Sequence, residues 1–231
     1  MQDAQFPKVF DRLTSPDAGT PPAGGIPNDV AAKVARSVVK VQGQACDLIQ
    51  EGSGFVARDD LVVTNAHVVA GERATEVFTP DGRRLDAVVV SFDPAVDLAV
   101  LRVDRLRLTV LDRADGALDE RGAVFGYPGG GPQRESPARI AEEITARGRD
   151  IYHSAPTSRD VFVLAAALVP GDSGGPLVDD RGRIVGVAFA VDPSQSSTAY
   201  ALTRAEVEAG LQRATKVGTT NAVGTGDCLV G

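Results

Sequence analysis

The sequence of 231 residues contains no run of about 18 or more apolar residues, and its N-terminus lacks the apolar segment of a signal peptide. We therefore expect no membrane-spanning helix within this chain. Basic residues are in the minority, since 24 Lys and Arg stand against 31 Asp and Glu, and the net charge is −7. Binding of nucleic acid needs a basic surface that neutralises phosphates, so this class of partner is not expected.

Histidine and cysteine are also scarce, with two of each. No carboxylate cluster stands near them at the spacing of metal ligands, so we expect neither a metal site nor another cofactor. Two free thiols are typical of a cytosolic chain, whereas one disulfide is typical of an exported one. The long separation of Cys46 and Cys228 is compatible with both.

The chain is long enough for one large domain or two small ones. Residues 1–27 are polar and rich in Pro, Gly, Asp and Thr, which predicts a flexible linker. The composition then changes, and Asn28 or Asp29 is expected to cap a short helix that ends at Ala35.

Short β-branched runs separated by Gly, Asp and Asn follow, in two groups of five or six. This pattern predicts antiparallel strands in two barrels that meet around residues 104–121. Only the last segment is clearly helical, with a capping box at Thr203 and Glu206 and an apolar face that includes Val207 and Leu211. The expected strands are 48–57, 61–64, 75–79, 84–92, 98–103, 123–127, 138–146, 161–167, 176–178, 184–190 and 198–202, after a β-pattern that begins at Val38.

Ser173 lies between small residues in the sequence Gly-Asp-Ser-Gly-Gly, residues 171–175. Such a turn buries little apolar area, but it suits an exposed hydroxyl flanked by backbone N–H groups that point at a developing oxyanion. A simple polar turn between strands is the alternative, and a base and an acid elsewhere decide between the two.

His67 follows an expected strand end and sits among small and apolar residues, so it is the better candidate base. His153 lacks such neighbours and is expected at the surface. Asp97 opens an apolar strand, where an ionisable group needs a partner, so it is the candidate for orienting the histidine. Asp93, before Pro94, fits a turn.

Histidine, aspartate and serine occur in the chain order of the chymotrypsin arrangement. The segments around these residues, 64–67, 97–100 and 171–177, resemble the three signature segments of trypsin-fold serine proteases. Gly52-Ser53-Gly54-Phe55 and the segment 126–129 are similar to the bacterial HtrA-like branch. The chain most resembles the protease domain of actinobacterial membrane-anchored acid-resistance proteases, over roughly residues 30–230.

The resemblance implies an all-β fold of two six-stranded antiparallel β-barrels of the chymotrypsin type with a C-terminal helix. Residues 28–112 would form the N-terminal barrel with His67 and Asp97. Residues 113–231 would form the C-terminal barrel with Ser173, the helix and the tail. Ser173 would be the nucleophile, His67 the general base and Asp97 the orienting carboxylate, and the N–H groups of Gly171 and Ser173 would form the oxyanion hole.

In zymogen-activated relatives, the aspartate before the nucleophile pairs with a new N-terminus released by cleavage. Asp172 is present, but no such activation site lies upstream of it in the ordered domain, so we expect no activation of this type and another partner for Asp172. Residues 161–170 contain no acid, which disfavours a pocket for Arg or Lys. The residues expected to line a shallow apolar primary pocket are Ala167, Phe189, Ala190, Val191 and Thr198.

The resemblance also implies a periplasmic location behind N-terminal membrane helices that are absent from this chain. Residues 1–27 would then be the tether and a possible site of self-cleavage, and Cys46 and Cys228 would form a disulfide. The expected activity is that of a serine endopeptidase acting on envelope proteins and linked to acid or oxidative stress. The alternative is a catalytically silent trypsin-like module for binding or chaperoning. An esterase of the nucleophile-elbow type is excluded, because its histidine follows its serine.

Overall fold

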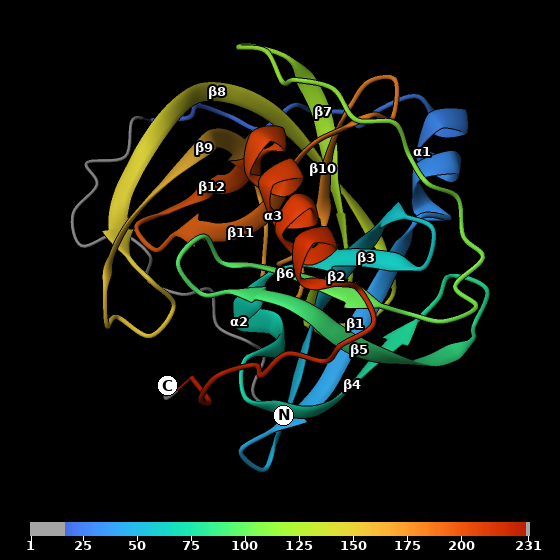
Figure 1. Cartoon of the computed structure of the whole chain (residues 1–231). Helices are drawn as coiled ribbons and strands as arrows, with labels where there is room; N and C mark the ends of the chain where they lie inside the picture. Colours follow the sequence, from blue (N-terminus) through green and yellow to red (C-terminus); the bar gives the residue numbers. More distant parts are fainter. Residues whose placement is uncertain (1–16, 230–231) are drawn as a thin grey trace.

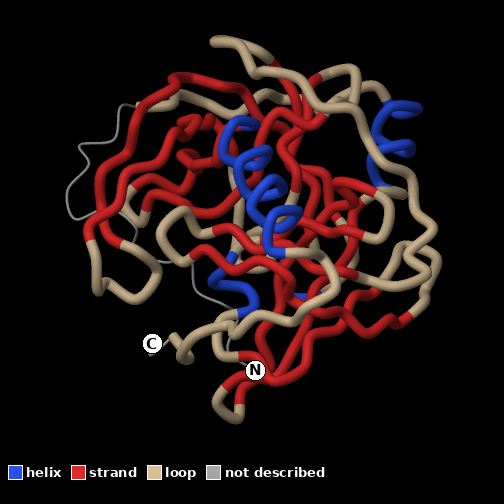
Figure 2. Tube along the Cα trace, in the orientation of Figure 1, coloured by secondary structure: helices blue, strands red, loops and turns tan. Residues whose placement is uncertain are grey.

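The computed structural model describes residues 17–229, and strands dominate this part of the chain (Figures 1 and 2). Twelve strands and the C-terminal helix α3 confirm the predicted all-β fold. The helices are α1 (Asn28–Ala35), α2 (Ala66–Val69), the 3₁₀ turn η1 (Pro128–Gly130) and α3 (Arg204–Val217). The strands are β1 (Val38–Ala45), β2 (Leu48–Arg58), β3 (Leu61–Thr64), β4 (Glu72–Phe78), β5 (Arg84–Asp93), β6 (Leu98–Arg102), β7 (Arg121–Gly126), β8 (Arg134–Arg149), β9 (Pro156–Ala166), β10 (Pro176–Asp179), β11 (Ile184–Asp192) and β12 (Gln195–Thr203).

The strands form two closed antiparallel barrels of six strands each. The first barrel has the order β1-β2-β3-β6-β5-β4, and the second has the order β10-β11-β12-β9-β8-β7. The chain leaves the first barrel at the end of β6 and enters the second at the start of β7, so residues 103–120 connect them. Helix α3 follows β12 and contacts strands of both barrels.

Several strands are buried on both faces, because one face lines a barrel and the other meets the opposite barrel or α3. On β6, Ala99 and Leu101 belong to the core of the first barrel. Leu98 and Val100 alternate with them and belong to a larger cluster that contains residues of both barrels and of α3. Since side chains alternate along a strand, a strand with two buried faces reads as a continuous apolar run.

Part of the expected linker is packed against the second barrel. Residues 1–16 lie outside the described residues, but Ala18 and Ile26 are buried. The carbonyl of Ala18 accepts a hydrogen bond from Arg139, and the Ile26 N–H donates to Glu135, both on β8. The packed part of the chain therefore begins before residue 28.

Both predicted helices are present, but the cap of α1 is wrong, and at α3 only the position of the N-cap residue is as predicted. Pro27 occupies the N-cap position of α1, and no side chain caps that end. Thr203 is the N-cap residue of α3, but its side chain makes no capping hydrogen bond. Glu206 instead accepts a hydrogen bond from the Asp160 N–H at 3.1 Å, so the capping box is replaced by a contact with β9.

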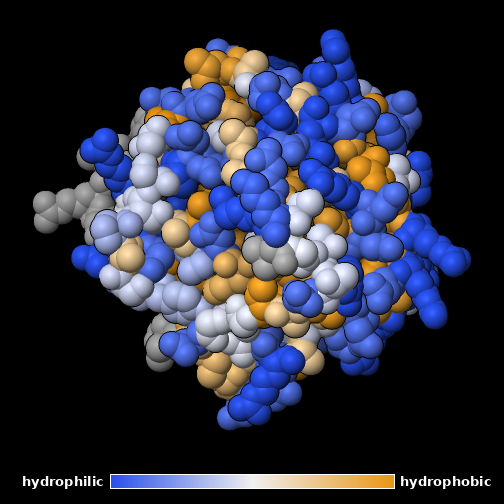
Figure 3. Space-filling view, viewed as in Figure 1, coloured by the Kyte–Doolittle hydropathy of each residue, from blue (hydrophilic) through white to orange (hydrophobic). Residues whose placement is uncertain are grey.

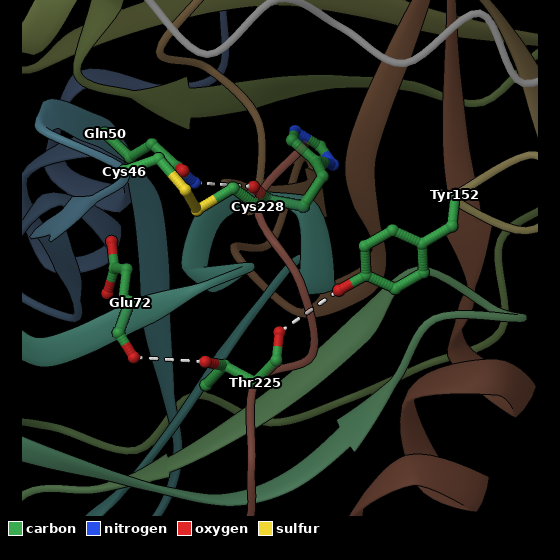
Figure 4. The surroundings of a disulfide bond; sticks show 7 residues. Cys46, Gln50, Glu72, Tyr152, Thr225 and Cys228 are labelled. Carbon is green, nitrogen blue, oxygen red and sulfur yellow. Dashed lines mark hydrogen bonds between the residues drawn. A yellow bond between two sulfur atoms is a disulfide. The ribbon is translucent and has the colours of Figure 1, made fainter. Parts of the chain in front are cut away.

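The tail after α3 crosses the first barrel and is fastened there (Figure 4). Cys46 and Cys228 form a disulfide, with their Cα atoms 6.2 Å apart. Thr225 donates from its hydroxyl to the Glu72 carbonyl, and the Thr225 carbonyl accepts from Tyr152 Oη, each at 3.1 Å. Because Tyr152 lies in the β8–β9 loop, the tail joins the second barrel to the first.

The face seen in Figure 3 is mostly hydrophilic, with apolar residues scattered singly or in small groups. Such a surface is ordinary for a globular domain. Within residues 17–229, no helix is both long enough and apolar enough to cross a membrane.

Candidate active site

His67 is held on the single turn of helix α2, which follows β3 directly. Its side chain is fully buried. Gln50 on β2 donates from Nε2 to the carbonyls of His67 and Val68, at 3.0 and 3.2 Å, and so satisfies groups at the C-terminal end of this turn. Ile151, from the β8–β9 loop, packs against Ala66 and fixes the turn from the other side.

Asp97 contacts His67 at two points. Its Oδ1 accepts from the His67 backbone N–H at 2.9 Å, and its Oδ2 lies 2.8 Å from His67 Nδ1. A carboxylate accepts only, so Nδ1 is assigned the proton and Nε2 is left as the basic nitrogen. Within the described residues, Nε2 has no hydrogen-bond partner.

The backbone of Asp97 is in the left-handed region, with φ of 68°. This conformation is uncommon outside glycine, although aspartate and asparagine adopt it more readily than other residues. Two hydrogen bonds hold it, because the Asp97 carbonyl accepts from Asn65 Nδ2 at 2.8 Å and the Asp97 N–H donates to the Asp93 carbonyl at 3.0 Å. The carboxylate is thereby aimed at α2.

Ser173 lies in the turn between β9 and β10, and its side chain is buried. Its carbonyl accepts from the Ser53 N–H at 2.7 Å, which ties the turn to β2 of the first barrel. A Cβ at Gly52 would lie 2.7 Å from Val68 and 3.2 Å from the Ser173 carbonyl. Glycine at position 52 therefore lets α2 and the serine turn approach the same point of β2. Among the described residues, Ser173 Oγ has no hydrogen-bond partner.

The carbonyls of residues 170–172 all accept hydrogen bonds from other residues of the chain. The Pro170 carbonyl accepts from Gly129 N, the Gly171 carbonyl from Ser53 Oγ, and the Asp172 carbonyl from Gly175 N, at 2.9, 2.7 and 3.0 Å. A trans peptide points its N–H away from its C=O, so the N–H groups of Gly171 and Ser173 are turned away from these partners. This arrangement suits the expected oxyanion hole.

Only glycine fits at position 171. Its φ is +97°, and a Cβ there would lie 2.4 Å from the Tyr127 carbonyl.

Arg134 is the partner of Asp172 that the sequence did not reveal. Its Nη2 lies 2.8 Å from Asp172 Oδ2, which also accepts from the Val169 N–H at 3.0 Å. Asp172 is almost fully buried, and this burial raises its pKa, while the Val169 N–H and Arg134 oppose the rise. Arg134 is one of 24 basic residues and lies 38 positions before Asp172, so no local signal singled it out.

Arg159 is a second residue that the sequence did not reveal. It is 2 % exposed, and its guanidinium lies 5.6 Å from the centre of the Phe189 ring. It donates to the carbonyls of Val96 and Arg149, at 3.4 and 2.8 Å, directly behind Asp97. Burial lowers its pKa, and the nearby charge of Asp97 opposes this.

The expected pocket residues lie on three elements of the second barrel. Ala167 is exposed after β9, whereas Phe189 and Ala190 on β11 and Thr198 on β12 are buried. The Phe189 ring lies in the core, with the guanidinium of Arg159 beside it. Val191 is half-buried.

The other polar residues singled out have structural surroundings. His153 is exposed. Asp93 accepts from the N–H groups of Ala95 and Val96 and so forms the expected turn. In residues 17–229, no three His, Cys, Asp or Glu side chains are grouped to hold a metal ion.

Comparison with known proteins decides the family. The profile of the trypsin-like peptidase domain matches residues 52–187, more than half of the chain. The chain belongs to the trypsin-like peptidase family. It is 41% identical over 227 residues to the serine protease Rv3671c of Mycobacterium tuberculosis, a match that covers 95% of this chain and 56% of the relative. The chain thus spans about half the length of the curated relatives it matches first.

A more distant relative is the Brucella suis protein named "Probable periplasmic serine endoprotease DegP-like". It is 35% identical over 158 residues, which cover 66% of this chain and 30% of that protein.

Two crystal structures of Rv3671c can be compared with this fold. The active form has a TM-score of 0.88 at 39% identity, covering 96% of this chain and all of that chain. The inactive form has a TM-score of 0.75 at 40% identity, covering 84% and 97%. The present structure is thus more similar to the active form.

Proposed function

We propose that this chain is the protease domain of a serine endopeptidase that uses Ser173, His67 and Asp97. The observation that carries the proposal is the two-point contact of Asp97 with His67. It places the proton on Nδ1 and leaves Nε2 as a base, which is what activation of a serine hydroxyl requires. The greater similarity to an active protease structure supports the proposal. Ser173 Oγ and His67 Nε2 make no hydrogen bond to each other in this structure, so the mechanism requires them to approach when substrate binds.

In the first half of the reaction, Ser173 Oγ attacks the carbonyl carbon of the scissile peptide bond and passes its proton to His67 Nε2. Asp97 stabilises the imidazolium that forms. The carbonyl oxygen becomes an oxyanion, and the N–H groups of Gly171 and Ser173 donate to it. Collapse of the tetrahedral intermediate breaks the C–N bond, and the leaving amine takes the proton from His67.

In the second half, a water molecule attacks the acyl-enzyme. His67 takes a proton from the water, a second oxyanion forms in the same place, and the proton returns to Ser173 as the acid product leaves. A single set of oriented groups therefore serves both steps.

We propose that the primary pocket takes a mid-sized uncharged side chain. Ala167 is small, and the expected lining residues Phe189, Ala190, Val191 and Thr198 carry no charge. A library of peptides should be cleaved after neutral residues. A profile dominated by Arg or Lys would contradict this proposal.

We propose further that the substrates are proteins of the cell envelope and that the activity serves acid or oxidative stress resistance. The resemblance to membrane-anchored proteases supports this, as does the word periplasmic in the name of the Brucella suis relative. The part of the arm that precedes the packed Ala18 would be the tether and a site of self-cleavage. N-terminal sequencing of wild-type and Ser173→Ala protein should find the arm lost only from the wild type.

Covalent labelling tests the catalytic proposal. A fluorophosphonate probe should label the wild-type protein, and Ser173→Ala should abolish the labelling. Ser196→Ala makes the same chemical change at an exposed serine and should leave the labelling intact. Labelling of the Ser173→Ala protein at full extent, or none of the wild type, would refute the proposal and favour a silent binding or chaperone module.

A further inference from the structure

Ser53 on β2 of the first barrel is the second residue of the Gly-Ser-Gly-Phe segment 52–55, to which the proposed mechanism gives no role. It is fully buried, and its N–H and hydroxyl, but not its carbonyl, form hydrogen bonds with the nucleophile turn. Its N–H donates to the Ser173 carbonyl, and its hydroxyl lies 2.7 Å from the Gly171 carbonyl. One residue of the first barrel thus holds two peptide units of the nucleophile turn in the second barrel.

The direction of the hydroxyl proton follows from its neighbours. The Tyr127 N–H donates to Ser53 Oγ at 2.9 Å, so the hydroxyl is the acceptor there. A serine hydroxyl has one proton to donate. Among the described residues, the Gly171 carbonyl is the only acceptor that forms a hydrogen bond with it. The Tyr127 N–H therefore orients the hydroxyl as a donor to Gly171.

The Gly171 carbonyl belongs to the peptide unit between the two expected oxyanion donors. The unit before it carries the Gly171 N–H, and the unit after it carries the Ser173 N–H. Gly171 has no Cβ and has φ of +97°, so its backbone is less restricted than that of the neighbouring Asp172. A hydrogen bond that fixes its carbonyl limits rotation about ψ of this residue and so limits how the two N–H groups turn relative to each other.

We propose that Ser53 is a positioning residue that orients the oxyanion-hole peptide through its hydroxyl. The proposal rests on the proposed serine protease function. Without the hydroxyl, the Gly171 carbonyl loses its partner, and the middle peptide unit is then held only through the Asp172 N–H, which donates to the Val169 carbonyl at 3.1 Å. The oxyanion is present only in the tetrahedral states, so loss of Ser53 Oγ weakens transition-state binding and leaves ground-state binding of the peptide unchanged.

The test compares Ser53→Ala with Ser37→Ala. Ser37 is also fully buried, and its Oγ donates to the Thr109 carbonyl at the same 2.7 Å, but it lies just before β1 and has no hydrogen bond to the nucleophile turn. Both variants lose one hydrogen bond from a hydroxyl to a carbonyl, and Ser53→Ala also loses the bond from the Tyr127 N–H. Ser53→Cys keeps a side chain of similar shape with a weak donor, and it decides the matter if Ser53→Ala does not fold.

We expect kcat of Ser53→Ala to fall by about tenfold to a hundredfold, with KM unchanged within about twofold, since removal of a whole oxyanion donor costs about 10²–10³. A peptidyl aldehyde, which forms a tetrahedral adduct, should lose affinity in parallel with kcat. The matching peptidyl alcohol, which forms no adduct, should bind as before. The kcat of Ser53→Cys should lie between those of the wild type and Ser53→Ala.

Equal activity of Ser53→Ala and Ser37→Ala at matched folded fraction would overturn the proposal, as would a rise of KM with unchanged kcat. The fluorophosphonate probe separates this failure from failure of the proposed function. If the wild type is labelled and Ser53→Ala is labelled equally fast, only the role of Ser53 is lost. If the wild type is not labelled, the proposed protease function itself is lost.

Discussion

Arg134 Nη2 lies 2.8 Å from Oδ2 of Asp172, the residue immediately before Ser173. In zymogen-activated proteases, which this chain resembles, the corresponding aspartate pairs with a new N-terminal amino group. Here a side chain at the start of β8 supplies the positive charge from within the folded chain. The nucleophile turn is thereby tied to β8 by Arg134 and to β2 by Ser53.

Arg134→Leu should destabilise the nucleophile turn, because it leaves the buried Asp172 carboxylate without its cation. We expect a loss of about 1–3 kcal/mol in the free energy of unfolding and a fall in kcat/KM. The loss is smaller than for a fully buried pair, because solvent reaches the Arg134 side chain, which is 41% exposed. Urea denaturation and peptide hydrolysis measure the two effects.

The pH dependence of this loss follows from the raised pKa of Asp172. Arg134 stabilises only the ionised carboxylate, so its contribution is present above the Asp172 pKa and fades as the pH falls through it. The control is Arg139→Leu, also on β8, whose partner Asp119 is exposed. Full activity of Arg134→Leu, or equal losses in the two variants, would contradict this role of Arg134.

The features predicted correctly from the sequence are those that depend on residues close together along the chain. Short β-branched runs separated by Gly, Asp and Asn predicted the strands, and the glycine-rich turn with a histidine and an aspartate upstream predicted the three site residues. The partner of Asp172 was out of reach, because Arg134 meets it only through the register of the second barrel. Arg159 was missed for the same reason, since no neighbouring residue in the sequence predicts that this arginine is buried near Asp97. The capping box at Thr203 failed because Glu206 bonds to β9 instead.

Asp97→Asn should lower kcat by about 10⁴ while the fold persists. Asparagine tolerates the left-handed backbone at position 97 as aspartate does, so the turn should remain. Its amide, however, has one oxygen and one NH2 group in place of the two accepting oxygens of Asp97, so it favours the wrong tautomer of His67. Steady-state kinetics with circular dichroism checks both parts. Asp93→Asn keeps the oxygen that accepts from Ala95 and Val96, so it should retain activity.

Loss of the Cys46–Cys228 disulfide should destabilise the domain by about 2–5 kcal/mol, because the bond closes most of the chain into one loop. The value should lie toward the lower end, since the tail is also held by hydrogen bonds from Arg102 to the Thr219 and Thr220 carbonyls. Thermal unfolding with and without dithiothreitol measures it. The double variant Cys46→Ser, Cys228→Ser should unfold at the same temperature in both conditions. An unchanged Tm of the wild type on verified reduction would contradict this prediction.

Glu72 should make the domain less stable as the pH rises. It is 8% exposed, and burial raises its pKa to about 8, while the hydrogen bond from Thr75 opposes the rise. In the unfolded chain, the same carboxyl ionises near its ordinary value of 4.5. Between these two values the unfolded state binds fewer protons than the folded state, so the free energy of unfolding falls with rising pH, by up to about 1.4 kcal/mol per unit.

Glu72→Gln removes this titration, so its free energy of unfolding should exceed that of the wild type at pH 8 and approach it near pH 4. Thr75→Val removes the bond that favours the ionised form and should extend the decline to higher pH. Urea denaturation from pH 4 to 9 measures all three proteins. Glu76→Gln makes the same change on β4, where the carboxylate pairs with Arg84, and serves as the control. If Glu72→Gln and wild type show the same dependence on pH, Glu72 is not the group that couples proton binding to unfolding.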